Sequence, residues 1–172
     1  MNESIQTLLQ RRSVRKYKPE QVSDELLSIV LNAGQYAASG MNKQNTILVA
    51  VREKATRDHL SKMNAAVMGS NGDPFYGAPC VIVVLADTER GTWVEDGSLV
   101  IGNLMNAAHA VGLGSCWIHR AREMFDSNEG KELLKAWGLP ENLRGVGNCI
   151  LGYPDEIPGE KPRLDGRIVK ID

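Results

Sequence analysis

The most informative segment of this chain is residues 11–17, with the sequence Arg11-Arg12-Ser13-Val14-Arg15-Lys16-Tyr17. Four cationic side chains and one hydroxyl lie within six consecutive residues. Arginine presents a planar fork of donors that matches the oxygens of a phosphate, and a serine hydroxyl adds one more donor. An arbitrary pair of arginines is more often a solvated patch on the surface. The rest of the sequence decides between a phosphate site and a charged surface.

The composition is that of an ordinary globular protein. The chain has 172 residues, of which 42% are hydrophobic and 24% are charged. We expect residues 1–172 to form a single domain with a real core. The net charge of −1 gives no general attraction to nucleic acid or to an anionic membrane, so the basic segment is a local feature.

The cysteines and histidines predict neither disulfides nor a metal site. Cys80, Cys116 and Cys149 each lie beside apolar residues and form no Cys-x-x-Cys pair, so we expect buried, reduced thiols. The three histidines show no ligand spacing, and we expect no metal. The N-terminus lacks an apolar signal core, and no apolar run reaches about 18 residues, so we expect a cytoplasmic protein without a membrane span.

Hydrophobic periodicity and breaker residues predict an α+β domain. Ser23 is the expected N-cap of the second helix, with acidic residues in its first turn. The expected helices cover residues 2–10, the segment after Ser23, 53–68, 93–111 and 129–137. The expected strands cover residues 46–51, 81–86, 113–118 and 146–151. The apolar run 81–86 is typical of a strand that is buried on both faces.

The usual phosphate and catalytic motifs are missing from the sequence. There is no Gly-x-x-x-x-Gly-Lys-Ser/Thr loop. The pair Gly112-x-Gly114 lacks the third glycine of a dinucleotide fingerprint and follows an expected helix instead of a strand. There is no Gly-x-Ser-x-Gly elbow, and no serine or cysteine has an evident histidine partner. The sequence therefore offers a phosphate site but no side-chain catalyst. This pattern favours a protein in which a bound cofactor carries out the chemistry.

Six short motifs occur along the chain in a definite order. They are Arg11-Arg12-Ser13-x-Arg15-x-Tyr17, Ser39-x-x-Asn42-x-Gln44, Tyr76-Gly77-Ala78-Pro79, Gly112-Leu113-Gly114-Ser115-Cys116-Trp117-Ile118, Leu151-Gly152-Tyr153-Pro154 and Lys161-x-Arg163. This order resembles the FMN-dependent nitroreductase family in its short form, over essentially the whole chain. The resemblance implies an α+β nitroreductase-like fold, with a central mixed or antiparallel sheet flanked by helices. It also implies a domain-intertwined homodimer with FMN at the subunit interface.

The resemblance also assigns cofactor-binding residues. Those expected at the FMN phosphate are Arg11, Ser13 and Arg15, with Arg12 along the ribityl or phosphate region and Lys161 and Arg163 closing from the far end of the chain. Those expected to reach the ribityl chain and ring from the partner subunit are Ser39, Asn42 and Gln44. Those expected beside the ring are Gly114 and Ser115, with Asn64 near its pyrimidine edge.

The chain departs from the family pattern in its polar loop. Ala38 and Asn45 stand where members often have proline, which leaves a more flexible loop. Tyr76 and Trp117 could stack near the flavin, but we expect them in the core, as is usual for such residues.

The implied activity is that of an FMN-dependent oxidoreductase. A hydride passes from NADH or NADPH to flavin N5, and the same site then reduces a nitroaromatic, a quinone or a flavin by a ping-pong mechanism. No side chain need act as acid or base, and the choice between NADH and NADPH stays open. The alternatives are a flavin-binding or flavin-sequestering protein with little turnover, and a reductive dehalogenase or flavin-fragmenting relative.

Overall fold

The computed structural model describes residues 2–171. Its helices and strands alternate along the chain as the sequence predicts. In chain order the elements are α1 (Glu3–Gln10), α2 (Asp24–Gln35), the 3₁₀ turn η1 (Gly40–Asn42), β1 (Thr46–Val51), α3 (Lys54–Met68), β2 (Cys80–Asp87), α4 (Trp93–Ala110), β3 (Gly114–Ile118), α5 (Ala121–Asp126), α6 (Asn128–Ala136) and β4 (Leu143–Gly152).

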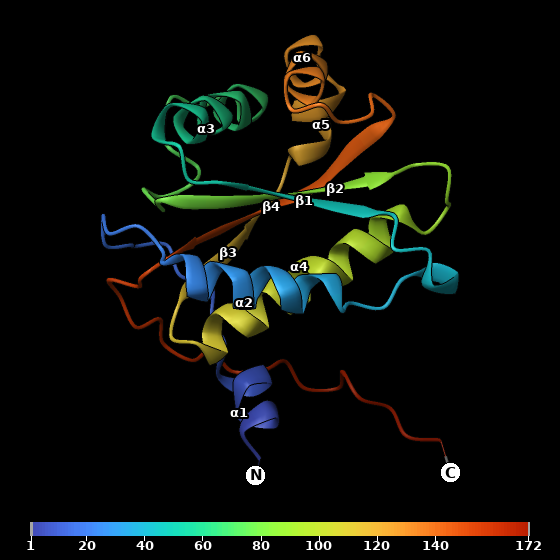
Figure 1. The fold of residues 1–172 in the computed structure, drawn as a ribbon. Helices are drawn as coiled ribbons and strands as arrows, with labels where there is room; N and C mark the ends of the chain where they lie inside the picture. Colours follow the sequence, from blue (N-terminus) through green and yellow to red (C-terminus); the bar gives the residue numbers. More distant parts are fainter. Residues whose placement is uncertain (1, 172) are drawn as a thin grey trace.

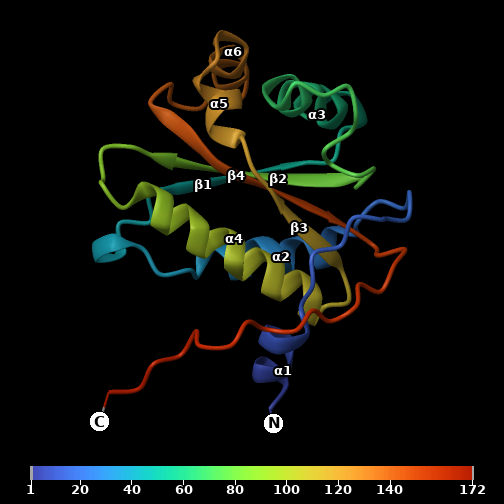
Figure 2. The ribbon, with the colours of Figure 1, turned by 180° about the vertical axis from the view of Figure 1, so that it is seen from behind.

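The strands form one antiparallel sheet in the order β1-β2-β4-β3. Helices α2 and α4 cover one face of this sheet, and α3, α5 and α6 lie over the other face (Figures 1 and 2). The α+β fold expected from the sequence is confirmed, and the sheet is antiparallel throughout the described strands.

Strand β2 shows why the sheet lies at the centre of the molecule. Its residues from Cys80 to Ala86 are all completely buried. The even-numbered residues belong to the core cluster with α2 and α4, and Val81, Val83 and Leu85 belong to the cluster with α3, α5 and α6. Successive side chains of a strand point to opposite faces, so a continuous apolar run is what a doubly covered strand requires.

The expected helices and strands are confirmed to within a few residues at their ends, and one helix was not predicted. Ser23 does cap α2, because its hydroxyl accepts the Leu26 amide at 3.3 Å. The unpredicted helix is α5, which has only six residues and follows Arg120 in a left-handed conformation with φ of 75°. A helix this short carries less than two turns of hydrophobic period, so the sequence pattern does not reveal it.

Cys80, Cys116 and Cys149 are buried free thiols, as expected. Burial raises the pKa of Cys80 to about 12, so this thiol is inert at neutral pH. Within residues 2–171, none of the helices combines the length and apolar character needed to cross a bilayer.

Candidate functional site

The basic segment 11–17 is fixed against strand β3. Ser13 and Ser115 form a parallel bridge, in which the Val14 amide donates to the Ser115 carbonyl oxygen at 3.0 Å. The Val14 side chain fills the space beside Gly114, where an added Cβ would lie 3.0 Å from three of its carbons. The absence of a side chain at Gly114 therefore permits the close approach of the basic segment to the sheet.

The residues that follow β4 hold the same segment from its other side. The Lys18 amide donates to the Tyr153 carbonyl, and the Asp155 amide donates to the Lys16 carbonyl, each at 2.9 Å. The Arg15 amide donates to the Glu156 carboxylate at 2.6 Å. The basic segment is thus a rigid strip between β3 and the start of the C-terminal tail.

The three guanidinium groups of this strip differ in what they bind. Arg12 donates to the carbonyl oxygens of Leu9 and Arg11, and it lies 3.4 Å from the Glu160 carboxylate. Nη1 of Arg11 is buried and has no hydrogen-bond partner among the described residues. Arg15 is exposed, and its guanidinium carbon lies 5.9 Å from the centre of the Tyr76 ring. A buried guanidinium nitrogen without an acceptor is rare, and a phosphate oxygen would satisfy it.

The surroundings of His109 show that the region beside Arg11 is electropositive. Burial lowers the pKa of His109 from its ordinary value, and the positive charges of Arg11 and Arg12 lower it further. His109 and Arg12 line a cavity of about 260 Å³ together with Ser115. The residues present therefore fit an anionic group such as the phosphate of FMN.

Arg15 lines a second cavity, of about 350 Å³. Its lining includes Tyr76 and the residues from Cys116 to Arg120. Asn64 supports this wall from within the core, where it is completely buried. Its amide nitrogen donates to the His119 carbonyl at 2.7 Å, and its oxygen accepts from Nε of Arg120 at 3.1 Å. The polar atoms of Asn64 are thus used inside the chain, and its contact with a flavin ring stays a prediction.

The polar loop that contains Ser39, Asn42 and Gln44 lies at the opposite end of the molecule from residues 11–15 (Figures 1 and 2). Asn42 and Gln44 have left-handed backbones, with φ of 54° and 51°. The Ser39 hydroxyl accepts the Gln44 amide at 3.0 Å, and the Asp96 carboxylate accepts the Gly40 amide at 2.8 Å. One chain does not bring this loop to the basic strip, so the expected joint site needs a second copy.

Lys161 and Arg163 lie on the exposed C-terminal tail. Within residues 2–171 neither side chain forms an ion pair. Glu160, directly before Lys161, lies beside Arg12, so the tail passes close to the basic strip before it leaves the body of the molecule. Closure of the two cations on a phosphate stays a prediction.

The structure adds two residues to the site that the sequence did not single out correctly. Tyr76 is 44% exposed and belongs to the second cavity, so the expectation that it is a core residue is wrong. Trp117 is half-buried and packs against the α2/α4 cluster. Glu156 binds the Arg15 amide, but it lies in the irregular tail, where no motif marks it. Tyr76 has a left-handed backbone, with φ of 53°, and no sequence pattern predicts this conformation.

Comparison with known proteins gives consistent similarities over the whole length. The model of the Nitroreductase family matches residues 8–72 and 66–153. A relative from Thermus thermophilus named NADH dehydrogenase is 37% identical, covering 86% of this chain and 85% of the relative. The FMN reductase [NAD(P)H] of Bacillus subtilis is 26% identical, covering 95% of this chain and 71% of the relative. The crystal structure of a nitroreductase with bound FMN from Bacteroides fragilis superposes with a TM-score of 0.92, at 28% identity and full coverage of both chains.

Proposed function

The chain belongs to the nitroreductase family, and from this premise we propose that it is an FMN-dependent oxidoreductase that takes electrons from NADH or NADPH. Relatives and structural neighbours that are named FMN reductases or contain FMN support this function. The acceptor is a nitroaromatic, a quinone or a flavin. Bound FMN supplies hydride acceptance and release at N5, which allows donor and acceptor to use one site in turn.

One observation of the structure carries the cofactor assignment. Nη1 of Arg11 is buried without a partner, in a strip that β3 and the tail hold rigid. We propose that Arg11, Ser13 and Arg15 hold the FMN phosphate, with Arg12 beside them. Arg12 already donates to two carbonyl oxygens of its own chain. Its proposed contribution to phosphate binding is therefore mainly its positive charge, because fewer of its donors are free. A dianionic phosphate would give the unsatisfied donor its acceptor and neutralise the cluster.

The other expected contacts fit the same arrangement. Gly114 and Ser115 pack against the strip, and the cavity of about 350 Å³ begins at the next residue, Cys116, so it leaves room for a donor or an acceptor beside a ring bound there. The proposed role of these residues is to orient the ring and to exclude water.

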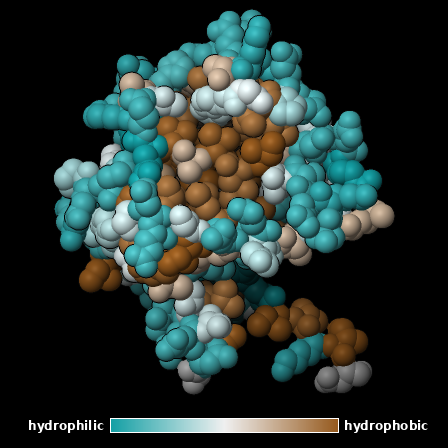
Figure 3. All heavy atoms as spheres, viewed as in Figure 1, coloured by the Kyte–Doolittle hydropathy of each residue, from teal (hydrophilic) through white to brown (hydrophobic). Residues whose placement is uncertain are grey.

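We propose that the protein acts as an intertwined homodimer, with FMN at the interface. Helix α1 has no buried residue, and Leu8 and Leu9 are more than half exposed. On the tail, Ile168 and Ile171 are 83% and 91% exposed. Figure 3 shows a hydrophobic hollow at the sheet edge between α3 and α6, and β1 at this edge has no second strand partner among residues 2–171. A second copy would cover these surfaces and bring its loop with Gln44 to the basic strip.

A measurement of mass in solution tests the dimer separately from the activity. We expect light scattering to give twice the chain mass, and removal of residues 161–172 to produce monomers that lose FMN. A monomeric full-length protein with full FMN occupancy would contradict the interface site. The single-domain organisation and the cytoplasmic location stay predictions, which the single sheet and the buried free thiols support.

The visible absorption spectrum of the purified protein tests the activity. We expect a yellow protein that bleaches when NADH or NADPH is added without oxygen, and that recolours when a quinone is added. The donor that bleaches faster is the preferred one. A yellow protein that neither nucleotide bleaches would favour flavin binding without turnover, and a protein that does not bind FMN would remove the basis of the proposal.

A further inference from the structure

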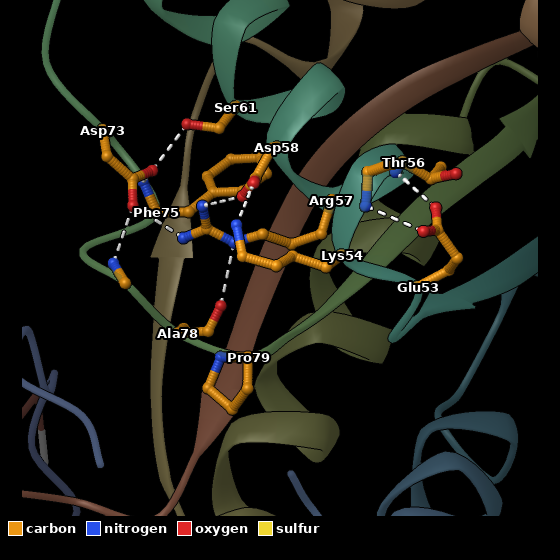
Figure 4. A network of polar contacts seen from close by, with 12 residues as sticks. Glu53, Lys54, Thr56, Arg57, Asp58, Ser61, Asp73, Phe75, Ala78 and Pro79 are labelled. Carbon is orange, nitrogen blue, oxygen red and sulfur yellow. Dashed lines mark hydrogen bonds and ion pairs between the residues drawn. The ribbon is translucent and has the colours of Figure 1, made fainter. Parts of the chain in front are cut away.

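A polar network connects helix α3 with the loop that precedes β2, outside the cofactor strip (Figure 4). Its centre is the Asp73 carboxylate, which accepts hydrogen bonds from Nη2 of Arg57 at 2.7 Å and from the Ser61 hydroxyl at 2.5 Å. The same carboxylate accepts the backbone amides of Phe75 at 2.9 Å and Gly77 at 2.7 Å. Asp73 thus joins the helix to both sides of the turn that carries Tyr76.

Arg57 completes this clamp from within the core. Its side chain is only 9% exposed, and Nε donates to the Ala78 carbonyl at 2.9 Å, just beyond the turn. The guanidinium carbon also lies 5.5 Å from the ring centre of Phe75, which is completely buried. The clamp, defined as Arg57, Ser61 and Asp73, therefore fixes the residues before and after Tyr76 by hydrogen bonds and by an anchored aromatic ring.

The backbone that the clamp fixes is strained. Tyr76 has φ of 53° and Gly77 has φ of 70°. The left-handed region costs a residue with a side chain about 1 kcal/mol, and such residues persist where the surroundings determine them. A tyrosine that is 44% exposed gains little burial in return. The strained backbone instead directs the phenol ring toward Arg15 and into the lining of the 350 Å³ cavity.

We propose that Tyr76 is a specificity-determining residue, an aromatic wall of the cavity that receives planar acceptors, and that the Arg57–Asp73 clamp positions it. This inference rests on the proposed function, because the cavity then lies beside the flavin ring. An aromatic wall favours flat conjugated acceptors such as naphthoquinones and nitroaromatics, which stack on it. A compact inorganic acceptor such as ferricyanide makes no stacking contact and serves as the reference.

The first experiment compares two acceptors in the Y76A and Y76F variants. We measure kcat/KM for a naphthoquinone and for ferricyanide with the same electron donor. The acceptor ratio is the naphthoquinone value divided by the ferricyanide value. The loss of one aromatic contact predicts a ratio about three- to tenfold lower in Y76A. Y76F keeps the ring and should give a ratio near that of the wild type. An unchanged ratio in Y76A overturns the assignment of Tyr76.

A binding measurement gives a readout that does not depend on turnover. Nicotinic acid is a planar ligand that cannot be reduced under these conditions, and its dissociation constant follows from the change in the visible flavin spectrum. We expect weaker binding of this probe to Y76A, by about the same factor as the change in ratio, and wild-type binding to Y76F. Equal affinity for all three proteins would contradict the proposed wall.

The clamp is tested by D73N, with D58N as the matched control. Asp58 also binds Arg57, at 3.0 Å, but no hydrogen bond in the structure joins it to the turn. We expect D73N to lower the acceptor ratio and D58N to leave it unchanged. If Asp73 acts through Tyr76, the D73N/Y76A double variant has the same ratio as Y76A alone. Additive losses would show that Asp73 does not act by positioning Tyr76.

The wild-type reactions separate this inference from the proposed function. If the wild type passes electrons from NADH or NADPH to ferricyanide, the proposed function stands whatever the variants do. A wild type that reduces neither acceptor overturns both. A working wild type with an unchanged Y76A variant overturns only the role of Tyr76.

Discussion

Val14 donates its backbone amide to the carbonyl oxygen of Ser115 at 3.0 Å, and this bond joins the basic strip to the edge of strand β3. Two segments a hundred residues apart in the sequence thereby become one surface. The Val14 side chain is 6% exposed and lies in the space beside Gly114. The position of the guanidinium groups thus depends on an apolar contact beneath them.

We predict that Gly114→Ala lowers both stability and FMN affinity. Its new Cβ would lie 3.0 Å from three carbons of Val14, which is too close for unchanged packing. Overpacking of this kind costs about 1–3 kcal/mol and displaces the basic strip. Denaturant unfolding and FMN titration measure the two effects. Gly102→Ala on α4 is the control, because nothing lies within 4 Å of a Cβ there. Equal FMN affinity in Gly114→Ala would show that Val14 does not position the strip.

We predict that Arg11→Ala weakens FMN binding by about 10- to 100-fold, the usual effect of losing a charged hydrogen bond. The protein without FMN should be equally or more stable, because Nη1 of Arg11 is buried without an acceptor in that state. Arg52→Ala removes a surface ion pair with Asp24 and serves as the control for a lost arginine. FMN titration and thermal unfolding of the cofactor-free proteins measure these effects. Unfolding of the cofactor-free Arg11→Ala variant would instead assign Arg11 a structural role.

We predict that FMN binding raises the pKa of His109. Without cofactor, burial and the charges of Arg11 and Arg12 hold this pKa below its ordinary value of 6.5. A nearby phosphate dianion offsets the two positive charges and favours the protonated imidazole. NMR titration of the histidine ring protons, with and without FMN, measures the change. The signals of His59 on α3 serve as the reference, and an unchanged His109 titration would place the phosphate elsewhere.

We predict that the clamp contributes stability that acid removes. Burial alone would raise the pKa of Asp73, but hydrogen bonds from Arg57, Ser61, Gly77 and Phe75 lower it below 3.8. Ionised Asp73 therefore favours the folded state above about pH 5, and this contribution disappears as the pH falls through 3.8 toward the lowered native value. Unfolding free energies between pH 3 and 7 should fall less steeply in D73N than in the wild type. Parallel pH profiles would contradict the lowered pKa.

Much of the fold follows from local patterns in the sequence. The apolar run of β2, the Ser23 cap and the helical spacing of α4 each depend on residues close together in the chain. Helix α5 is not predicted from the sequence because it is too short to show a hydrophobic period. The sequence shows the basic strip as a cluster of cationic residues. Its fixed position depends on hydrogen bonds to Ser115 and Tyr153, which are far away in the sequence.

The candidate site was less predictable than the fold. The sequence identifies the arginines of the strip, yet it does not distinguish the unsatisfied Arg11 from Arg12, which binds carbonyl oxygens of its own chain. The exposure of Tyr76 depends on a left-handed backbone that Asp73 stabilises through amides in the loop. These features arise from tertiary hydrogen bonds, which hydrophobic periodicity does not encode.

The hydrogen bonds between residues 16–18 and residues 153–155 have a thermodynamic consequence. They tie the proposed phosphate strip to the beginning of the tail that is proposed to hold the partner subunit. Since FMN is proposed to contact both subunits, the factor by which bound FMN strengthens association equals the factor by which association strengthens FMN binding. We therefore expect the measured affinity for FMN to rise with protein concentration, and dilution alone to release the cofactor.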